Sequence, residues 1–220
     1  MRVLDCGGGS GRFAVPLAVA GAEVTVVDVS ADALSTLRMR AAEAGVAERV
    51  DAVQREIESL FADDAVLPDS RLRPAQFDLV LAHGVLEAVE DVPAAFGQIA
   101  TGVRPGGLLS VLAANPAAAV LARALAGDLA GALHDLDAAD TRPPEADASP
   151  DHVAELCAAA GFAVERTSGV GVFREIVPGA ALEVPGAAAA LDELEQRCTR
   201  RFPFSHIAAS IHLLARRPTP

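Results

Sequence analysis

A strand that runs directly into a glycine-rich turn constrains this chain more than any other feature. The predicted strand Arg2–Cys6 is followed by Gly7, Gly9 and Gly11 at alternate positions. Glycine is needed where a backbone turns tightly and approaches a ligand closely, and a helix that begins behind the turn offers free N–H groups. The pattern therefore predicts a ligand-binding turn at the end of a strand in an α/β sheet.

Short apolar runs alternate along the chain with Ala- and Leu-rich segments of helical period. This pattern is typical of a parallel sheet with helices on both faces. The expected strands are Arg2–Cys6, Glu23–Asp28, Val50–Gln54, Phe77–Ala82 and Leu108–Ala113, with later strands near Val164–Phe173 and Ile207–Arg216. Helices are expected in the gaps, and two late helices should run from Ser149 to Ala160 and from about Gly186 to Arg201.

The chain is expected to form one domain over residues 1–220. Its length fits a single core, and an apolar share of 51% excludes a mostly disordered protein. Residues 114–150 are expected to be an insertion or lid within that domain. Asp135–Pro150 is rich in Asp, Ala and Pro, which favours a loop.

Charge and cysteine content narrow the function classes. A net charge of -12 argues against a broad electropositive surface for nucleic acid or anionic membranes. Three cysteines without metal-type spacing indicate a reducing compartment, so we expect a cytoplasmic protein with no zinc site. The first residues show no basic segment followed by an apolar one, so no signal peptide is expected. The uncharged stretch 105–122 is interrupted by glycines and a proline, which favours a buried strand and a helix over a membrane span.

Asp28 ends the second predicted strand, about 20 residues after the glycine turn. An acid at this place binds the ribose hydroxyls of a nucleoside in folds of this kind. The two features together indicate a nucleoside cofactor. The alternative is that the glycines only form a turn and that Asp28 caps the next helix.

The glycine turn resembles the first motif of class I S-adenosylmethionine-dependent methyltransferases, Asp-x-Gly-x-Gly-x-Gly, beginning at Asp5. Phe77–His83 resembles that family's fourth strand, and Arg104–Leu109 resembles its turn into the fifth. The resemblance implies a Rossmann-like, mostly parallel sheet with an antiparallel last strand, and S-adenosylmethionine as the cofactor. The contacts it implies are made by Asp5, Gly7, Gly9, Gly11, Asp28, Val29, Glu56, Ile57 and His83.

A narrower resemblance covers almost the whole chain and is to the tRNA carboxymethoxyuridine methyltransferases. Its marks are His83–Glu87, Gly169–Phe173, Leu194–Arg197 and Ile211–Leu213. The resemblance implies that a carboxylate on the wobble uridine of tRNA is esterified. It also implies that Arg197 and Arg200 hold this acceptor, since a forked guanidinium suits a carboxylate that is already ionised.

Structural interpretations of these residues stay open. Arg197 and Arg200 could form a solvated charge run that complements a helix dipole. His83 is a candidate catalytic residue that lines the pocket; it could instead be a histidine held by backbone groups, or a general base. His212 is expected to be structural. Glu87 could close the pocket or cap the following segment.

Alternative functions also stay open. The family's tyrosines are absent and its basic segment is replaced by acidic residues, which would suit a small-molecule O- or N-methyltransferase. A degenerate protein that binds the cofactor without turnover is another alternative. Methyltransferases of this kind carry a helix before the first strand, so we expect that the natural start lies upstream or that the cofactor binds weakly.

Overall fold

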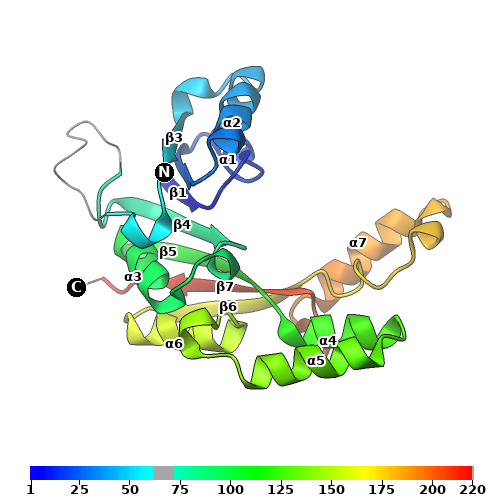
Figure 1. The fold of residues 1–220 in the computed structure, drawn as a ribbon. Coiled ribbons are helices and arrows are strands. Elements are labelled where there is room, and N and C mark those ends of the chain that lie inside the picture. Colours follow the sequence, from blue (N-terminus) through cyan, green and yellow to red (C-terminus); the bar gives the residue numbers. More distant parts are fainter. Residues whose placement is uncertain (62–71, 220) are drawn as a thin grey trace.

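One seven-stranded sheet runs through the computed structural model, which describes residues 1–61 and 72–219 (Figure 1). The strand order is β3-β2-β1-β4-β5-β7-β6, and only β7 is antiparallel to its neighbours. The strands are β1 (Arg2–Cys6), β2 (Glu23–Asp28), β3 (Val50–Gln54), β4 (Phe77–His83), β5 (Val103–Ala114), β6 (Ala163–Val170) and β7 (Ser210–Arg216). The expected mostly parallel sheet is confirmed.

Helices cover both faces of the sheet, as predicted (Figure 1). They are α1 (Ala14–Val19), α2 (Ala31–Glu43), α3 (Val92–Gly102), α4 (Pro116–Leu125), α5 (Leu129–Asp140), α6 (Pro150–Ala159) and α7 (Ala187–Cys198). Val3 of β1 packs in the cluster with α1 and α2, whereas the next residue, Leu4, packs in the cluster with α3 and α6. Because both faces are buried, β1 is a continuous buried run after Arg2.

Side-chain caps fix where five of the helices begin, and those of α4 and α5 are Asn115 and Asp128. Ser30 accepts a hydrogen bond from the backbone at the start of α2, Asp91 does so for α3, and Ser149 does so for α6. Such caps satisfy N–H groups that have no partner within the helix. The caps of α2 and α3 follow shortly after β2 and β4, so they also set the course of the two loops that leave the carboxyl edge of the sheet.

The segment expected to be a loop, Asp135–Pro150, is the clearest error of the sequence prediction. Its first part belongs to α5, which continues to Asp140. Asp128 caps this helix, and the guanidinium of Arg123 pairs with both Asp128 and Asp135. These contacts place one positive charge beside two of the acidic side chains, and the Ala-rich sequence keeps its helical preference.

The last part of the chain forms a small separate core beside the sheet. Cys198 at the end of α7 packs with Val172, Ala208 and Ile211. Figure 1 shows α7 projecting from the carboxyl edge of the sheet, with α4 and α5 below it. No helix in residues 1–61 and 72–219 is long and apolar enough to cross a membrane.

Candidate cofactor and acceptor sites

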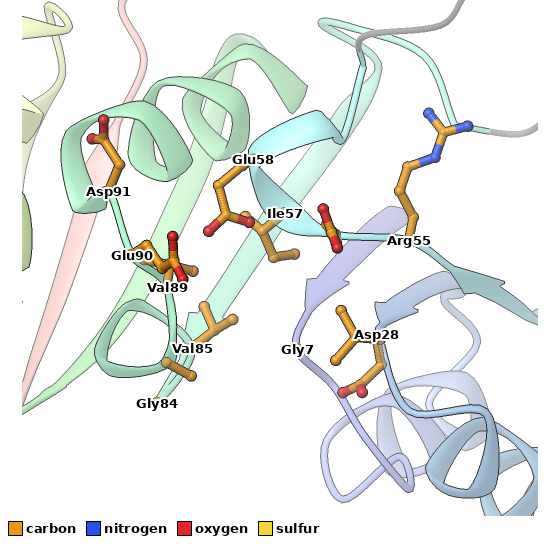
Figure 2. A pocket seen from close by; sticks show the side chains of 13 residues that line it. Gly7, Asp28, Arg55, Ile57, Glu58, Gly84, Val85, Val89, Glu90 and Asp91 are labelled. Carbon is orange, nitrogen blue, oxygen red and sulfur yellow. The ribbon is translucent and has the colours of Figure 1, made fainter.

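A cleft of about 740 Å³ lies at the carboxyl ends of β1, β2 and β3, facing the loop after β4. Figure 2 shows side chains from the segment after β3, such as Ile57 and Glu58, opposite Val85 and Val89 of that loop. Open α/β sheets bind ligands at this edge, where the order of strands reverses between β1 and β4. The lining residues are Gly7, Asp28, Val29, Arg55, Glu56, Ile57, Glu58, Gly84, Val85, Ala88, Val89, Glu90 and Asp91.

The glycine turn packs closely against its neighbours because two of its positions have no side chain. A Cβ at either position would collide with a neighbouring residue. At Gly7 the backbone has a φ of +68°, and a Cβ there would lie 2.6 Å from Val85. At Gly11 the φ is +81°, and a Cβ would lie 2.3 Å from Leu37. The turn therefore requires glycine at both positions. The helix behind it, α1, begins at Ala14.

Asp28 holds the glycine turn in place from the end of β2. Its Oδ2 accepts a hydrogen bond of 2.9 Å from the N–H of Gly9, and its Oδ1 accepts one of 2.9 Å from Ser30. The side chain also lines the cleft. Asp28 thus joins the two elements that the sequence analysis assigned to a nucleoside cofactor, and its oxygens have capacity for further donors.

Asp5 lies beneath the turn and is 1% exposed. A Cβ at Gly8 would come within 2.6 Å of its carboxyl carbon, and its Oδ2 is buried without a hydrogen-bond partner. Burial, with a smaller contribution from the charge of Asp28, raises the pKa of Asp5 to about 7. Asp5 does not line the cleft, so it acts on the site only from beneath the turn.

The lining of the cleft is strongly acidic. Five carboxylate side chains, those of Asp28, Glu56, Glu58, Glu90 and Asp91, face one guanidinium, that of Arg55. Such a surface favours a ligand with positive charge. Sequence reasoning placed Asp28, Val29, Glu56 and Ile57 in the site but missed Glu58, Glu90 and Asp91, which come together only when the chain folds.

His83 ends β4 but is not among the residues that line the cleft. Its Nε2 lies 2.8 Å from the Oγ of Ser110, which lies 2.7 Å from the Nε2 of His212. A hydroxyl has one proton, so it donates to one imidazole and accepts from the other. Burial, and then the charge of His212, lowers the pKa of His83 to about 4, which keeps its ring neutral at neutral pH.

Two further hollows continue the carboxyl edge beyond β4. One, of about 530 Å³, includes Glu87 and Arg142, and the other, of about 280 Å³, is mainly apolar and includes Leu121, Val172 and Ile176. They share Ala114, Asn115 and Ala119 at the start of α4. Glu87 accepts a hydrogen bond of 2.6 Å from the N–H of Ala114, so it ties the loop after β4 to the end of β5.

Glu195 organises the segment after β6. Its carboxylate accepts hydrogen bonds of 2.9, 2.9 and 2.8 Å from the backbone N–H groups of Val172, Phe173 and Arg174. Two sequence motifs that lie far apart in the chain, around residues 171 and 195, are therefore one structural unit. This unit forms one wall of the apolar hollow.

The two arginines predicted to hold the acceptor do not share a helical face. Arg197 lies near the end of α7, exposed and 3.2 Å from Glu193, whereas α7 ends at Cys198, so Arg200 lies beyond it. The arginine that shares a hollow of about 390 Å³ with Arg197 is Arg201. Neither Arg197 nor Arg200 lines the cofactor cleft.

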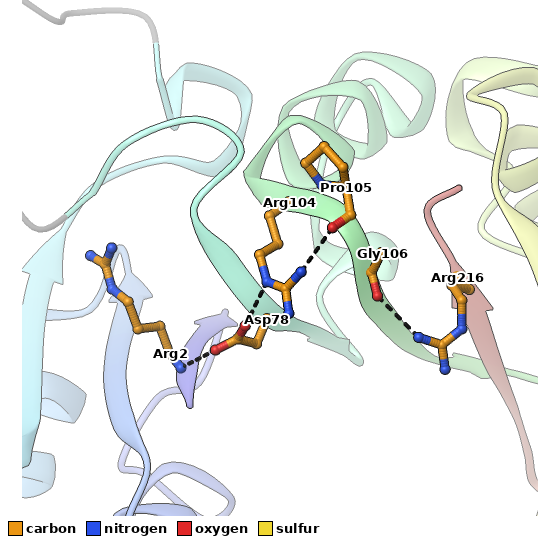
Figure 3. Close-up of polar contacts among 6 residues, drawn as sticks. All are labelled: Arg2, Asp78, Arg104, Pro105, Gly106 and Arg216. Atoms are coloured by element: carbon orange, nitrogen blue, oxygen red, sulfur yellow. Dashed lines mark hydrogen bonds and ion pairs between the residues drawn. The ribbon is translucent and has the colours of Figure 1, made fainter. Parts of the chain in front are cut away.

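The opposite edge of the sheet is closed by polar contacts (Figure 3). Asp78 accepts 2.7 Å and 2.6 Å hydrogen bonds from the N–H of Arg2 and from Arg104, and Arg216 donates to the carbonyl of Gly106 at 3.0 Å. These contacts join the amino ends of β1, β4 and β5 to the end of β7. Open clefts therefore lie at the carboxyl edge, where the loops diverge.

Within residues 1–61 and 72–219, no group of three or more His, Cys, Asp and Glu side chains is arranged to hold a metal ion. The cysteines Cys6, Cys157 and Cys198 are buried and unpaired. Burial, and then the charge of Asp5, raises the pKa of the Cys6 thiol at the end of β1 well above its ordinary value.

Comparison with known proteins agrees with this architecture. Residues 4–109 match the family described as a methyltransferase domain. The tRNA 5-carboxymethoxyuridine methyltransferase of Escherichia coli K12 is 29% identical over 99% of this chain and 80% of its own length. The ubiquinone biosynthesis O-methyltransferase of Xanthomonas euvesicatoria pv. vesicatoria 85-10 is 35% identical, over 55% of this chain and 47% of its own length.

A solved structure shares the fold over nearly the whole chain. It is the geranyl diphosphate C-methyltransferase of Streptomyces coelicolor A3(2), crystallised with Mg²⁺, geranyl diphosphate and S-adenosyl-L-homocysteine. The similarity covers 98% of this chain and 72% of that one, with a TM-score of 0.60 and 15% sequence identity.

Proposed function

Because this protein is a class I methyltransferase that uses S-adenosylmethionine, we propose that it esterifies the carboxylate of a carboxymethoxyuridine at the wobble position of tRNA. The observation that carries the proposal is the length of the similarity to the E. coli enzyme. That similarity covers 99% of the chain, whereas the ubiquinone enzymes match only about half of it. It thus includes the segments after β5, which shape the acceptor side.

The cleft at the ends of β1, β2 and β3 would hold the cofactor. We assign the ribose hydroxyls to Asp28, the adenine to Glu56 and Ile57, and a flanking contact to Val29. Gly7, Gly9 and Gly11 form the turn that lets the methionine part approach, and Asp5 supports it from below. The acidic lining suits a ligand with a sulfonium and an ammonium group.

When bound, S-adenosylmethionine supplies an electrophilic methyl group. A carboxylate acceptor is ionised at neutral pH, so its oxygen attacks without a base, and the residues mainly align the two partners and exclude water. His83 is neutral there and sits at the end of β4 beside Phe13, with 4.8 Å between the ring centroids. We propose that its neutral ring lies below the reacting groups, next to the cleft, and accepts no proton.

We propose that Arg197 and Arg200 hold the acceptor. Arg197 lies in the last turn of α7 and Arg200 just beyond it, and Cys198 between them packs with Ile211 of β7. β7 is two strands from β4, a strand separation of about 10 Å. An acceptor that is part of a polymer can bridge this distance. The helical hairpin of α4 and α5, within residues 114–150, would then act as a lid beside it.

The apolar hollow between α4 and the segment after β6 favours a second candidate function. Of the side chains that line it only Glu175 is ionisable, so it suits an uncharged ring or chain. A small-molecule O- or N-methyltransferase would use such a hollow for its acceptor. The net charge of -12 also agrees with an acceptor that has no phosphates.

Transfer of labelled methyl from S-adenosylmethionine to bulk tRNA from cells that lack this activity tests the proposal. Label that mild alkali removes from the tRNA would support esterification of a carboxylate. Binding of the cofactor without transfer to tRNA would contradict it and favour the small-molecule candidate. Binding without transfer to any acceptor would indicate a protein that has lost catalysis.

A variant pair assigns the acceptor site in the same assay. Arg197→Gln should leave the affinity for S-adenosylmethionine unchanged and reduce transfer to tRNA about tenfold, the loss of one charge-assisted contact. The control is Arg38→Gln, on the exposed side of α2. Equal transfer by both variants would assign Arg197 to the solvated helix end.

We also propose that the protein acts in the cytoplasm. Its three cysteines are unpaired in the structure, which agrees with a reducing compartment.

A further inference from the structure

An exposed patch of arginine and phenylalanine follows α7. We call it the α7-end patch, and it consists of Arg200, Arg201, Phe202 and His206. Phe202 is 75% exposed, more than any other large apolar side chain in the described part of the chain. Its ring meets that of His206 edge-on, with 5.3 Å between the centroids, so one face of the phenyl ring has no ring against it among the described residues.

The positive charge of the patch is not cancelled by the acidic residues of α7. Asp192 pairs with Arg174 at 2.6 Å, Glu193 pairs with Arg197 at 3.2 Å, and Glu195 is occupied by three backbone N–H groups. Each of these carboxylates is therefore already compensated, although the protein as a whole is acidic.

Two guanidinium groups of the patch have no such partner. In the part of the chain that the structure describes, the side chains of Arg200 and Arg201 form no hydrogen bond or ion pair. Both are exposed. An anion that meets them therefore displaces only water, and it gains two charge-assisted donors.

A hollow lies next to the α7-end patch. It measures about 390 Å³ and lies between the last turn of α7 and the chain that follows, with Arg197 and Arg201 on its walls and Phe204 beside them. Glu193 also lines it but is paired with Arg197, so Arg201 is its uncompensated charge. The hollow combines a guanidinium donor with an aromatic surface.

We propose that the α7-end patch and this hollow bind a nucleotide of single-stranded RNA next to the methylated one. Arg201 contacts its phosphate, and the exposed ring of Phe202 stacks on its base. Single-stranded nucleic acid is bound by this combination, because every base has a π-face and every link carries a negative charge. The inference rests on the proposed function and adds to it a binding site for the neighbouring nucleotide. Such a site would let the protein distinguish an RNA chain from a free nucleoside.

Fluorescence anisotropy of a labelled single-stranded anticodon-loop RNA tests the patch without requiring catalysis. Phe202→Leu keeps the apolar surface but removes the aromatic face, and it should weaken binding about fivefold to thirtyfold at every salt concentration. Arg201→Gln should weaken binding as well. It should also reduce the slope of log affinity against log salt by about 0.7, the share of one phosphate contact.

The control variants are Met39→Ala, an exposed apolar side chain of α2, and Arg38→Gln on the same helix. Both should leave RNA affinity unchanged. If Phe202→Leu and Arg201→Gln bind RNA as tightly as the unaltered protein, the patch is not an RNA site, even if tRNA is methylated. If their affinity falls as expected while tRNA accepts no label, the patch stands and the proposed esterification fails.

Discussion

Asp5 gives the sharpest test of the electrostatics beneath the glycine turn. Its carboxyl group is almost fully buried, and its pKa is raised from an ordinary 3.8 to about 7, first by burial and then by Asp28. The unfolded chain ionises near 3.8, so the folded protein binds one more proton between these values. The stability contributed by protonated Asp5 is therefore complete below about pH 3.8 and is lost as the pH rises through 7.

The size of this loss follows from the pKa shift. A difference of 3.2 between about 7 and 3.8 corresponds to about 4 kcal/mol of unfolding free energy. The variant Asp5→Asn retains the shape of the side chain but cannot ionise. Its unfolding free energy, taken relative to the unaltered protein, should therefore rise by about 4 kcal/mol between pH 4 and pH 8.

Urea unfolding followed by circular dichroism, without cofactor and at a series of pH values, measures this difference. The amide of the Asp5→Asn variant adds a constant cost of burial, so the trend with pH is the readout and not the offset. Thr25→Val, at a buried polar position of β2 that does not titrate, is the control and should change the unfolding free energy by the same amount at every pH. An Asp5→Asn curve parallel to that of the unaltered protein would refute the reasoning.

Three further predictions concern the rest of the site. Asp28→Asn should weaken S-adenosylmethionine binding by about 1–3 kcal/mol in titration calorimetry, through loss of charge-assisted hydrogen bonds; unchanged affinity would remove Asp28 from the ribose site. Gly7→Ala should lower the unfolding free energy by about 2–4 kcal/mol, because its Cβ meets Val85 and its φ is positive. Val85→Ala in the same chain should restore part of this loss, and no restoration would mean that packing is not the cause. The folded-state pKa of His83 is about 4 against an ordinary 6.5, so the stability of its neutral form is complete above 6.5 and falls as the pH drops toward 4. His83→Gln should reduce the loss of unfolding free energy at acid pH by about 2 kcal/mol, a value lowered because the ring is partly exposed. Chemical denaturation at pH 4.5 and at pH 7 measures this loss. An equal loss in the variant and in the unaltered protein would contradict the assignment.

The sheet could be predicted from the sequence because its strands are buried on both faces. The ranges Arg2–Cys6, Glu23–Asp28 and Val50–Gln54 match β1, β2 and β3 residue for residue. The start of β5 could not be placed, since Val103–Gly107 contains a proline and two glycines that indicate a turn. In the structure the strand begins at Val103, which pairs with Phe77, and an irregularity precedes the regular ladder at Leu108.

Only the parts of the candidate site that depend on local sequence patterns could be predicted. The glycine turn and Asp28 belong to local patterns, and the structure brings them within hydrogen-bond distance. The row from His83 through Ser110 to His212 joins three strands, and no spacing along the chain reveals it. The partner of Arg197 was predicted on the assumption that the helix continued past Cys198.

A crystal structure of the protein with S-adenosylhomocysteine tests the central claim most directly. The account predicts the nucleoside in the cleft at the ends of β1, β2 and β3, with the ribose hydroxyls on Asp28 and the adenine beside Ile57. Ligand bound away from this cleft, or a ribose that makes no contact with Asp28, would contradict it.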